Sequence, residues 1–340
     1  MNIQSNLLKL VGDHERISTI GMCKNAGKTT VLGALIDECD SQGLKIALCS
    51  VGRDGELVDV VTNTEKPSIS VRRGTIFSTT SGLVSCCNID MKLMHSTKIS
   101  TALGEVLIFK AKSHGDIQLS GPSINTQLVP LMNFFKSHGA QKVLIDGAVC
   151  RKASSSPIIA SASILCTGAD YDSDMRKVIA DTAHFASLMN TKSLQSDVYR
   201  ALIGEHRGTN EVLIFDHSGL LSHHGKYELV ENDFRKRVKL AYFSGALTDK
   251  TFEDALGGFR SASGLTVVAE NPSKIMLSSE LSDILKLRGC ELFVLEPITL
   301  ACICINPFST SGTHFDKNEF LEGMQAAVDG VGVEVINVLG

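Results

Sequence analysis

The fold of this chain is decided by the stretch Gly21-Met22-Cys23-Lys24-Asn25-Ala26-Gly27-Lys28-Thr29-Thr30. An apolar run from Ile17 to Ile20 leads into it, and a pattern typical of an α-helix follows it. A glycine-rich turn between a buried strand and a helix presents backbone N–H groups and the positive end of the helix dipole. These features predict a loop that binds phosphate groups. The alternative is a strand-to-helix turn that binds no ligand.

The residue types at the end of this loop predict how phosphates would be held. Lys28 would reach the terminal phosphates, the hydroxyl of Thr29 would bind Mg²⁺, and Thr30 would contact a more proximal phosphate. We also predict a catalytic role for Lys28. The remaining predicted contacts of the loop are Gly21, Lys24, Asn25, Ala26 and Gly27.

The spacing of the loop differs from the common G-x-x-x-x-G-K-[ST] pattern, because Gly21 lies one residue earlier. This G-x5-G-K-T-T form resembles the dethiobiotin synthetase and cobyric-acid-synthase-like branch of P-loop proteins more than the kinase or Ras-like branches. Members of that branch bind ATP. The resemblance therefore implies ATP and Mg²⁺ as cofactors.

Composition and charge limit the class of protein. The chain has 340 residues, of which 43% are hydrophobic, so it can form two domains or one enlarged α/β domain. A formal net charge of −4 and the lack of a long basic run exclude a general attraction to nucleic acid or to anionic membranes. Neither partner is expected, and no apolar window reaches the roughly 20 residues of a membrane span.

The ten cysteines and the N-terminal segment indicate the compartment. The cysteines form no C-x-x-C pair and lie mostly inside apolar runs, which is typical of reduced thiols. The first eleven residues lack the apolar core and cleavage site of a signal peptide. We therefore expect a cytoplasmic protein.

Alternating strand and helix patterns predict an α/β fold with a mostly parallel sheet. The strand before the loop, a helix over 29–41 and an apolar strand over 45–51 form a βαβ unit. Between about 67 and 121, short β-like runs flank a polar helical stretch at 81–93, which predicts an inserted α/β segment. The whole pattern favours a P-loop NTPase fold with inserted α/β segments.

Two acidic residues are candidates for the metal site. The stretch Lys142-Val-Leu-Ile-Asp146-Gly147 predicts a strand that ends in an acid, and such an acid beside the loop can hold a Mg²⁺-bound water. We predict Asp146 as a Walker-B-like residue with catalytic and metal-binding roles, and Asp54 as a second Mg²⁺ contact. Ordinary charged turns at strand ends are the alternative for both.

The end of the chain predicts a contact with the base. In the dethiobiotin-synthetase-like fold, an Asn directly after a late core strand meets the adenine, and Asn306 has that place in the order of elements. A plain Asn-Pro turn is the alternative. The match implies a discontinuous nucleotide-binding core, 1–190 plus 298–340, with an inserted α/β unit at 191–297.

Two other groups of residues suggest chemistry less strongly. Asp216, His217, His223 and His224 are types that bind metals, but their spacing fits no metal motif, and an exposed histidine-bearing hairpin is favoured. Cys150 lies beside two basic residues, yet the sequence places no histidine base near it. A structural thiol is favoured there.

Four stretches together resemble one family, the ATP-binding subunit of the lysine 5,6-aminomutase reactivase. They are Gly21 to Thr30, Val143 to Ala148 with Arg151 and Lys152, Ile164 to Ala169, and Cys304 to Pro307. The resemblance implies an ATPase that acts with a second, MutS-like subunit. Together they would restore an adenosylcobalamin-dependent aminomutase in lysine fermentation. Residues 191–297 are then the predicted docking region.

Two other functions use the same phosphate site. A dethiobiotin-synthetase-like ligase would phosphorylate a small carboxylate or carbamate, and it needs a basic anchor that the sequence does not clearly supply. A partner-gated regulatory ATPase or GTPase is the other alternative. GTP is less favoured because the sequence lacks a clear N-K-x-D element.

Overall fold

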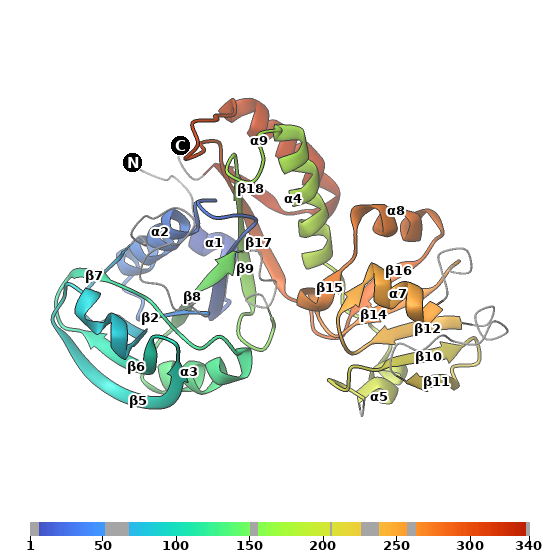
Figure 1. Cartoon of the computed structure of the whole chain (residues 1–340), viewed down its shortest axis with the longest axis horizontal. Coiled ribbons are helices and arrows are strands. Elements are labelled where there is room, and N and C mark those ends of the chain that lie inside the picture. Colours follow the sequence, from blue (N-terminus) through green and yellow to red (C-terminus); the bar gives the residue numbers. More distant parts are fainter. Residues whose placement is uncertain are drawn as a thin grey trace. The chain divides into compact units, whose positions relative to one another are not determined.

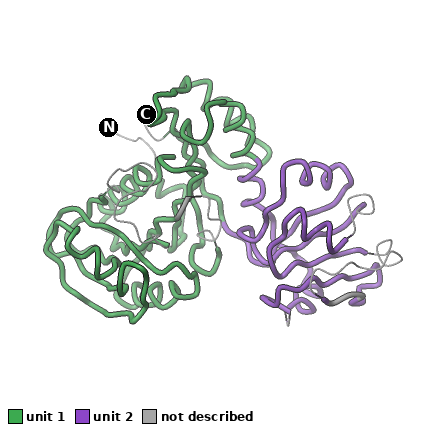
Figure 2. Tube along the Cα trace, viewed as in Figure 1, with its two compact units in different colours: residues 1–183, 299–340 green, residues 184–298 purple. Residues whose placement is uncertain are grey.

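The computed structural model describes residues 7–51, 68–149, 156–204, 206–225, 238–256 and 263–337. The chain forms two compact units (Figure 2). Unit 1 consists of residues 1–183 and 299–340, and unit 2 of residues 184–298. Unit 1 is therefore assembled from two distant parts of the sequence. The sequence analysis had placed the two boundaries after residues 190 and 297.

A nine-stranded sheet organises unit 1, in the order β18-β17-β9-β1-β8-β2-β4-β6-β5 (Figure 1). All neighbouring pairs from β18 to β4 are parallel, and β6 and β5 extend the sheet as an antiparallel hairpin. The fold is thus α/β with a large, mostly parallel mixed sheet. The strands are β1 Arg16–Gly21, β2 Ile46–Ser50, β4 Ile76–Thr80, β5 Met91–Thr101, β6 Gly104–Ala111, β8 Lys142–Val149, β9 Ala162–Gly168, β17 Thr299–Asn306 and β18 Glu334–Asn337.

The helices of unit 1 pack on this sheet through apolar faces. In α2, Val31, Leu32 and Leu35 recur at helical spacing and are fully buried, and each contributes about 1.5–3 kcal/mol. The helices are α1 Leu7–Val11, α2 Lys28–Ser41, α3 Asn125–Ser137, α4 Met175–Met189, which continues into unit 2, and α9 Lys317–Val328. In the described ranges, no helix has the length and apolar character needed to cross a membrane.

Helices α4 and α9 lie side by side (Figure 1). A Cβ at Gly323 of α9 would lie 2.8 Å from Cδ1 of Ile179 in α4. The terminal methyl of Ile179 thus occupies the space beside the glycine, and a larger residue at position 323 would have to displace it.

The segment between 68 and 121 is β-structure, so the predicted α/β insertion was wrong in type. Its described residues contain no α-helix: the expected helical stretch is a six-residue 3-10 helix, Ser81–Cys86, after which β5 begins. Strand β5 pairs with the apolar strand β6, and β4 joins the main sheet. The pairing of these residues with neighbouring strands therefore determined their structure, and it outweighed the helical pattern of the local sequence. A small ribbon of β3 Ile69–Val71 and β7 Gly115–Ile117 completes the segment.

Unit 2 contains its own five-stranded sheet, in the order β11-β10-β12-β14-β16. The last three strands are parallel, and β10 and β11 form an antiparallel hairpin. Its elements are β10 Val212–Asp216, β11 Leu221–Gly225, β12 Val238–Phe243, β13 Leu247–Thr248, β14 Thr266–Ala269, β15 Ile275–Met276, β16 Glu291–Val294, α5 Asp197–Gly204, α7 Asp249–Leu256 and α8 Ser279–Leu287.

An ionic cluster lies at the carboxyl ends of β14 and β16. The guanidinium of Arg207 donates to Glu270, with Nε 2.7 Å from the carboxylate, and also to Glu296. The buried hydroxyl of Tyr242 donates to Glu270 as well. Burial and the nearby carboxylates raise the pKa of Tyr242. The single positive charge of Arg207 is therefore shared between two carboxylates, and the cluster keeps a net charge of −1.

All nine cysteines in the described part of the chain are free thiols. Three of them, Cys166, Cys302 and Cys304, are buried together in the core of unit 1. Hydrogen bonds with the other two thiols, and burial, raise the pKa of Cys304 well above its usual range. These sulfurs act as neutral core side chains.

We predict that the contact between β9 and β17 depends on Gly168. A Cβ there would lie 2.2 Å from the carbonyl oxygen of Asn306, so Gly168→Ala should lower the free energy of unfolding by about 1–3 kcal/mol. Chemical denaturation measures this change. The control is Gly33→Ala in α2, where a Cβ meets no atom within 4 Å and stability should rise by about 0.5–1 kcal/mol. Equal effects of the two substitutions would contradict the prediction.

Candidate functional site

The backbone of residues 22–27 contains two left-handed residues. Asn25 and Gly27 adopt left-handed conformations, with φ of 56° and 93°, and they flank Ala26, which does not. Asparagine and glycine are the residues that tolerate this conformation best. Successive residues of opposite hand form concave nests of N–H groups. The methyl of Ala26 is fully buried in the core, so this residue can offer a ligand only its backbone.

The N-terminus of α2 adds to this anion-binding character. The helix begins at Lys28, directly after Gly27, and no side chain caps its first N–H groups. Its first turn contains no acidic residue. The positive end of the helix dipole at this point is therefore not offset by a carboxylate of the helix itself. An anion is the natural partner of such a helix end.

Lys28 folds back over the loop that precedes it. Its ammonium donates to the carbonyl of Cys23, with Nζ 2.9 Å from the oxygen. A Cβ at Gly21 would lie 2.7 Å from that ammonium and 3.1 Å from the Cys23 carbonyl oxygen. A side chain at position 21 would therefore displace the lysine from its present path across the loop. The ammonium and the loop backbone together form one positively charged surface.

Asp146 lies on β8, the direct neighbour of the strand that leads into the loop. It pairs with Thr19 of β1 and with Ser50, the last residue of β2. The structure corrects the expected strand end, because β8 continues past Asp146 to Val149. The pairing with β1 shifts by one residue in this stretch, which is the mark of a β-bulge.

The carboxylate of Asp146 affects the pKa of a buried thiol in the sheet. The Cys49 thiol on the neighbouring strand is fully buried, and burial together with the Asp146 carboxylate raises its pKa. Asp146 itself is only half-buried. Its carboxylate thus belongs to a partly hydrated position next to the loop strand, which suits a metal-bound water. The metal-binding role of Asp146 stays a prediction.

Asn306 connects the two distant parts of unit 1. Its side-chain nitrogen donates to the carbonyl of Asn25, with the two atoms 3.1 Å apart, and its side-chain oxygen accepts from the backbone N–H of Phe308 at 3.0 Å. One side chain thereby ties the loop of residues 22–27 to the turn after β17. The predicted contact between Asn306 and a base is not tested by these bonds.

The sequence analysis did not predict a second contact with the turn after β17, which is made by Asp170. One carboxylate oxygen of Asp170, just after β9, accepts from the hydroxyls of Ser309 and Thr310 and from the backbone N–H of Thr310. Its other oxygen is buried and has no hydrogen-bond partner in the described structure. Thr310 also accepts from the side chain of Asn25 at 3.4 Å. The signal in the sequence was an acid directly after a strand end.

The other predicted residues divide into two groups. Lys24 and Thr30 are exposed and Thr29 is half-buried, so all three can be reached from solvent. Asp54, Cys150 and the basic residues beside Cys150 lie outside the described residues. The structure thus brings together the loop, Asp146 on the adjacent strand and Asn306.

The histidine-bearing segment is the hairpin that the sequence analysis favoured. Strands β10 and β11 pair in antiparallel fashion, and Asp216 accepts hydrogen bonds from Ser218 and Leu220 in the turn. The hydroxyl of Ser218 contributes most to a lowered pKa of Asp216. In the described part of the chain, no cluster of three or more potential metal ligands forms.

No protein-family model, curated protein or solved structure matches this chain. The chemistry of the site therefore rests on its own geometry. A nest of N–H groups, an uncapped helix N-terminus and a lysine that covers the loop form an arrangement that suits a polyphosphate. A half-buried carboxylate on the adjacent strand suits its divalent cation.

We predict that Asn306→Ala loosens the loop of residues 22–27 without unfolding unit 1. The substitution removes the donor to Asn25 and the acceptor from Phe308, and water can replace them only in part. Hydrogen exchange of peptides covering residues 22–30 and 307–311 should become faster. Asn318→Ala, at an exposed position in α9, is the matched control and should change neither peptide. Unchanged exchange in both variants would disprove the connection.

Proposed function

We propose that this protein is an ATPase that binds the triphosphate and Mg²⁺ at the loop of unit 1. The observation that carries the proposal is the contact of Lys28 with the loop backbone at an uncapped helix N-terminus. That arrangement offers N–H groups, a helix dipole and an ammonium to a single anion. ATP in particular is proposed from the G-x5-G-K-T-T spacing.

Each residue has a separate task in this proposal. The loop backbone and Lys28 would hold the phosphates, and the hydroxyl of Thr29 would be a ligand for Mg²⁺. Asp146, on the strand next to the loop strand, would contribute to the metal site. Mg²⁺, when bound, neutralises the charge that develops on the phosphates. The contribution of the chain is then alignment and charge neutralisation rather than covalent chemistry.

We further propose that hydrolysis serves a partner protein. The four stretches that resemble the reactivase subunit support this reading, with a MutS-like subunit and a cobalamin-dependent aminomutase as partners. ATP binding would then favour one of two conformations of the complex, and hydrolysis would release it. Unit 2, which the chain inserts into unit 1, is the proposed docking unit. Its helix α5 exposes Val198 and Leu202 on one face, four residues apart.

We predict that Lys28→Ala abolishes ATP hydrolysis and weakens ATP binding by about ten- to hundredfold. A lysine–phosphate contact is a charge-assisted hydrogen bond, and its loss has an effect of that size. Calorimetry measures binding, and phosphate release measures turnover. The control is Lys45→Ala, which removes an exposed lysine at the amino end of β2, away from the loop. Wild-type turnover in Lys28→Ala would show that the loop is not the catalytic site.

We predict that the partner function requires both the loop and the surface of unit 2. Purified protein, a MutS-like subunit, inactivated lysine 5,6-aminomutase and ATP should together restore mutase activity. Lys28→Ala should bind the partners but restore no activity. The double variant Val198→Asp and Leu202→Asp should hydrolyse ATP alone and lose partner binding in a pull-down, because charged side chains disrupt an apolar contact. ATPase activity without recovery in the wild type would retain the nucleotide site and reject the aminomutase.

A further inference from the structure

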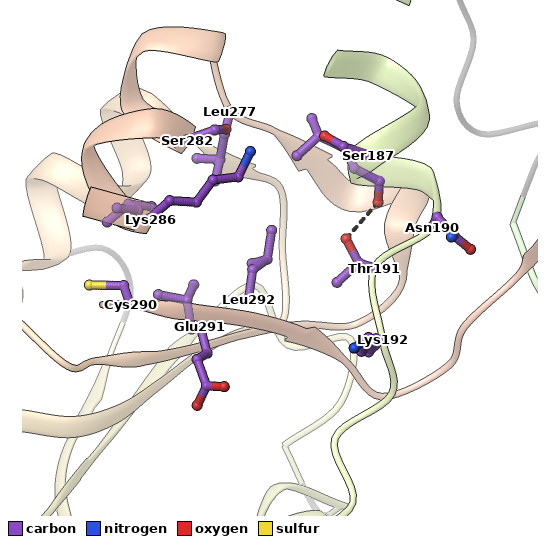
Figure 3. Close-up of a pocket in the computed structure, with 13 residues that line it drawn as sticks. Ser187, Asn190, Thr191, Lys192, Leu277, Ser282, Lys286, Cys290, Glu291 and Leu292 are labelled. Atoms are coloured by element: carbon purple, nitrogen blue, oxygen red, sulfur yellow. Dashed lines mark hydrogen bonds between the residues drawn. The ribbon is translucent and has the colours of Figure 1, made fainter. Parts of the chain in front are cut away.

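Unit 2 contains a cavity of about 270 Å³ beneath helix α8 (Figure 3). Its walls are α8, the C-terminal end of α4 with the residues that follow it, and the first residues of β16. All of the lining residues lie between Ser187 and Leu292, within unit 2. The phosphate loop belongs to unit 1. The cavity is therefore a separate feature of the molecule.

The wall formed by α8 holds an unsatisfied hydroxyl. Ser282 is only 6% exposed, and its Oγ is buried without a hydrogen-bond partner in the described structure. Buried hydroxyls in proteins are nearly always paired, so this one calls for an explanation. A rotation about χ1 redirects a serine hydroxyl at little cost. A polar ligand in the cavity would supply the missing partner.

Two lysines line the same cavity. Lys286 follows Ser282 by one helical turn on α8, so both side chains lie on one face of the helix. The acid nearest to its ammonium is Asp283, 3.7 Å away, and both side chains are about two-thirds exposed, so this pair is weak. Lys192 contributes from the segment after α4, and within the described residues it forms no ion pair.

One acid offsets these charges in part. Glu291 lines the cavity, but it is exposed, and Figure 3 shows its carboxylate on the side away from Ser282 and Lys286. The end of the cavity at α8 thus combines an ammonium with an unpaired hydroxyl. Both groups are hydrogen-bond donors. An anionic acceptor matches them.

The rest of the lining is apolar. Figure 3 shows Leu292 of β16 below Leu277 and Lys286. The other apolar residues of the lining are Leu188, Val267 and Leu285. A floor of branched aliphatic side chains favours an aliphatic ligand body over a sugar or a base. The volume is on the order of ten non-hydrogen atoms at the packing of a liquid.

We propose that this cavity binds a small aliphatic carboxylate. The carboxylate oxygens accept from the hydroxyl of Ser282 and the ammonium of Lys286, and the hydrocarbon chain packs on Leu277, Leu285 and Leu292. Lys192 adds positive charge at the opposite wall. The site makes no use of the phosphate loop, so it stands whether or not the chain hydrolyses ATP.

Isothermal calorimetry of the full-length protein with isocaproate tests this proposal. Isocaproate should bind with one-to-one stoichiometry, and the neutral isocaproamide should bind about tenfold more weakly, because it lacks the charge-assisted hydrogen bonds. Lys286→Met should reduce the affinity for isocaproate by about tenfold. Lys250→Met, an exposed lysine of α7 outside the lining, is the control and should leave binding unchanged.

Ser282→Ala separates a ligand contact from a structural role. Since the hydroxyl has no partner in the protein, its removal should leave the Tm unchanged or raise it, while isocaproate binds more weakly. Lys28→Ala should bind isocaproate like the wild type. The proposal fails if isocaproate gives no saturable heat at millimolar concentration, or if acid and amide bind equally. It also fails if Lys28→Ala abolishes the binding.

Discussion

One hydrogen bond joins residues that are 281 positions apart, from the side chain of Asn306 to the backbone of Asn25. It holds the loop of residues 22–27 against the end of β17, the strand that pairs with β9. Gly168 permits that approach, since any side chain there would collide with the backbone of Asn306. The pairing of β17 with β9 thus joins the two distant parts of unit 1, and the Asn306 side chain adds a link from β17 to the loop.

Local patterns predicted much of the secondary structure. The helix expected over 29–41 begins one residue early, at Lys28, and ends at Ser41 as predicted. Strand β9 shows a limit of such patterns. The apolar run that leads into it begins at Ile158, yet β9 begins only at Ala162, because residues 156–160 form a turn in which Ile159 and Ala160 donate to Ser156. An apolar run indicates that its residues are buried, but burial alone does not distinguish a strand from a buried turn.

The site could be predicted only where its chemistry is local. The loop, Lys28 and Gly21 form a contiguous motif, and their backbone geometry follows from glycine and asparagine at the left-handed positions. The hydrogen bond from the backbone N–H of Thr310 to Asp170 joins residues that are 140 positions apart, so no local spacing of residues in the sequence predicts it. The hairpin of β5 and β6 was not predicted for a related reason. The pairing of β5 with β6, and of β6 with β4, stabilises strand structure even though the first residues of β5 have a helical pattern.

The two ends of the sheet in unit 2 differ in charge pairing, and this difference decides where a ligand can bind. Parallel sheets usually bind ligands at the carboxyl ends of their strands. In unit 2 that end carries Arg207, whose guanidinium already donates to Glu270 and Glu296 within the chain.

The cavity lies at the other end of the sheet, where Glu291 and Leu292 begin β16. There the ammonium of Lys286 has only a weak partner and the hydroxyl of Ser282 has none in the described structure. The position at which unit 2 can bind an anion is therefore indicated by hydrogen-bond donors without strong partners, and not by the topology of the sheet.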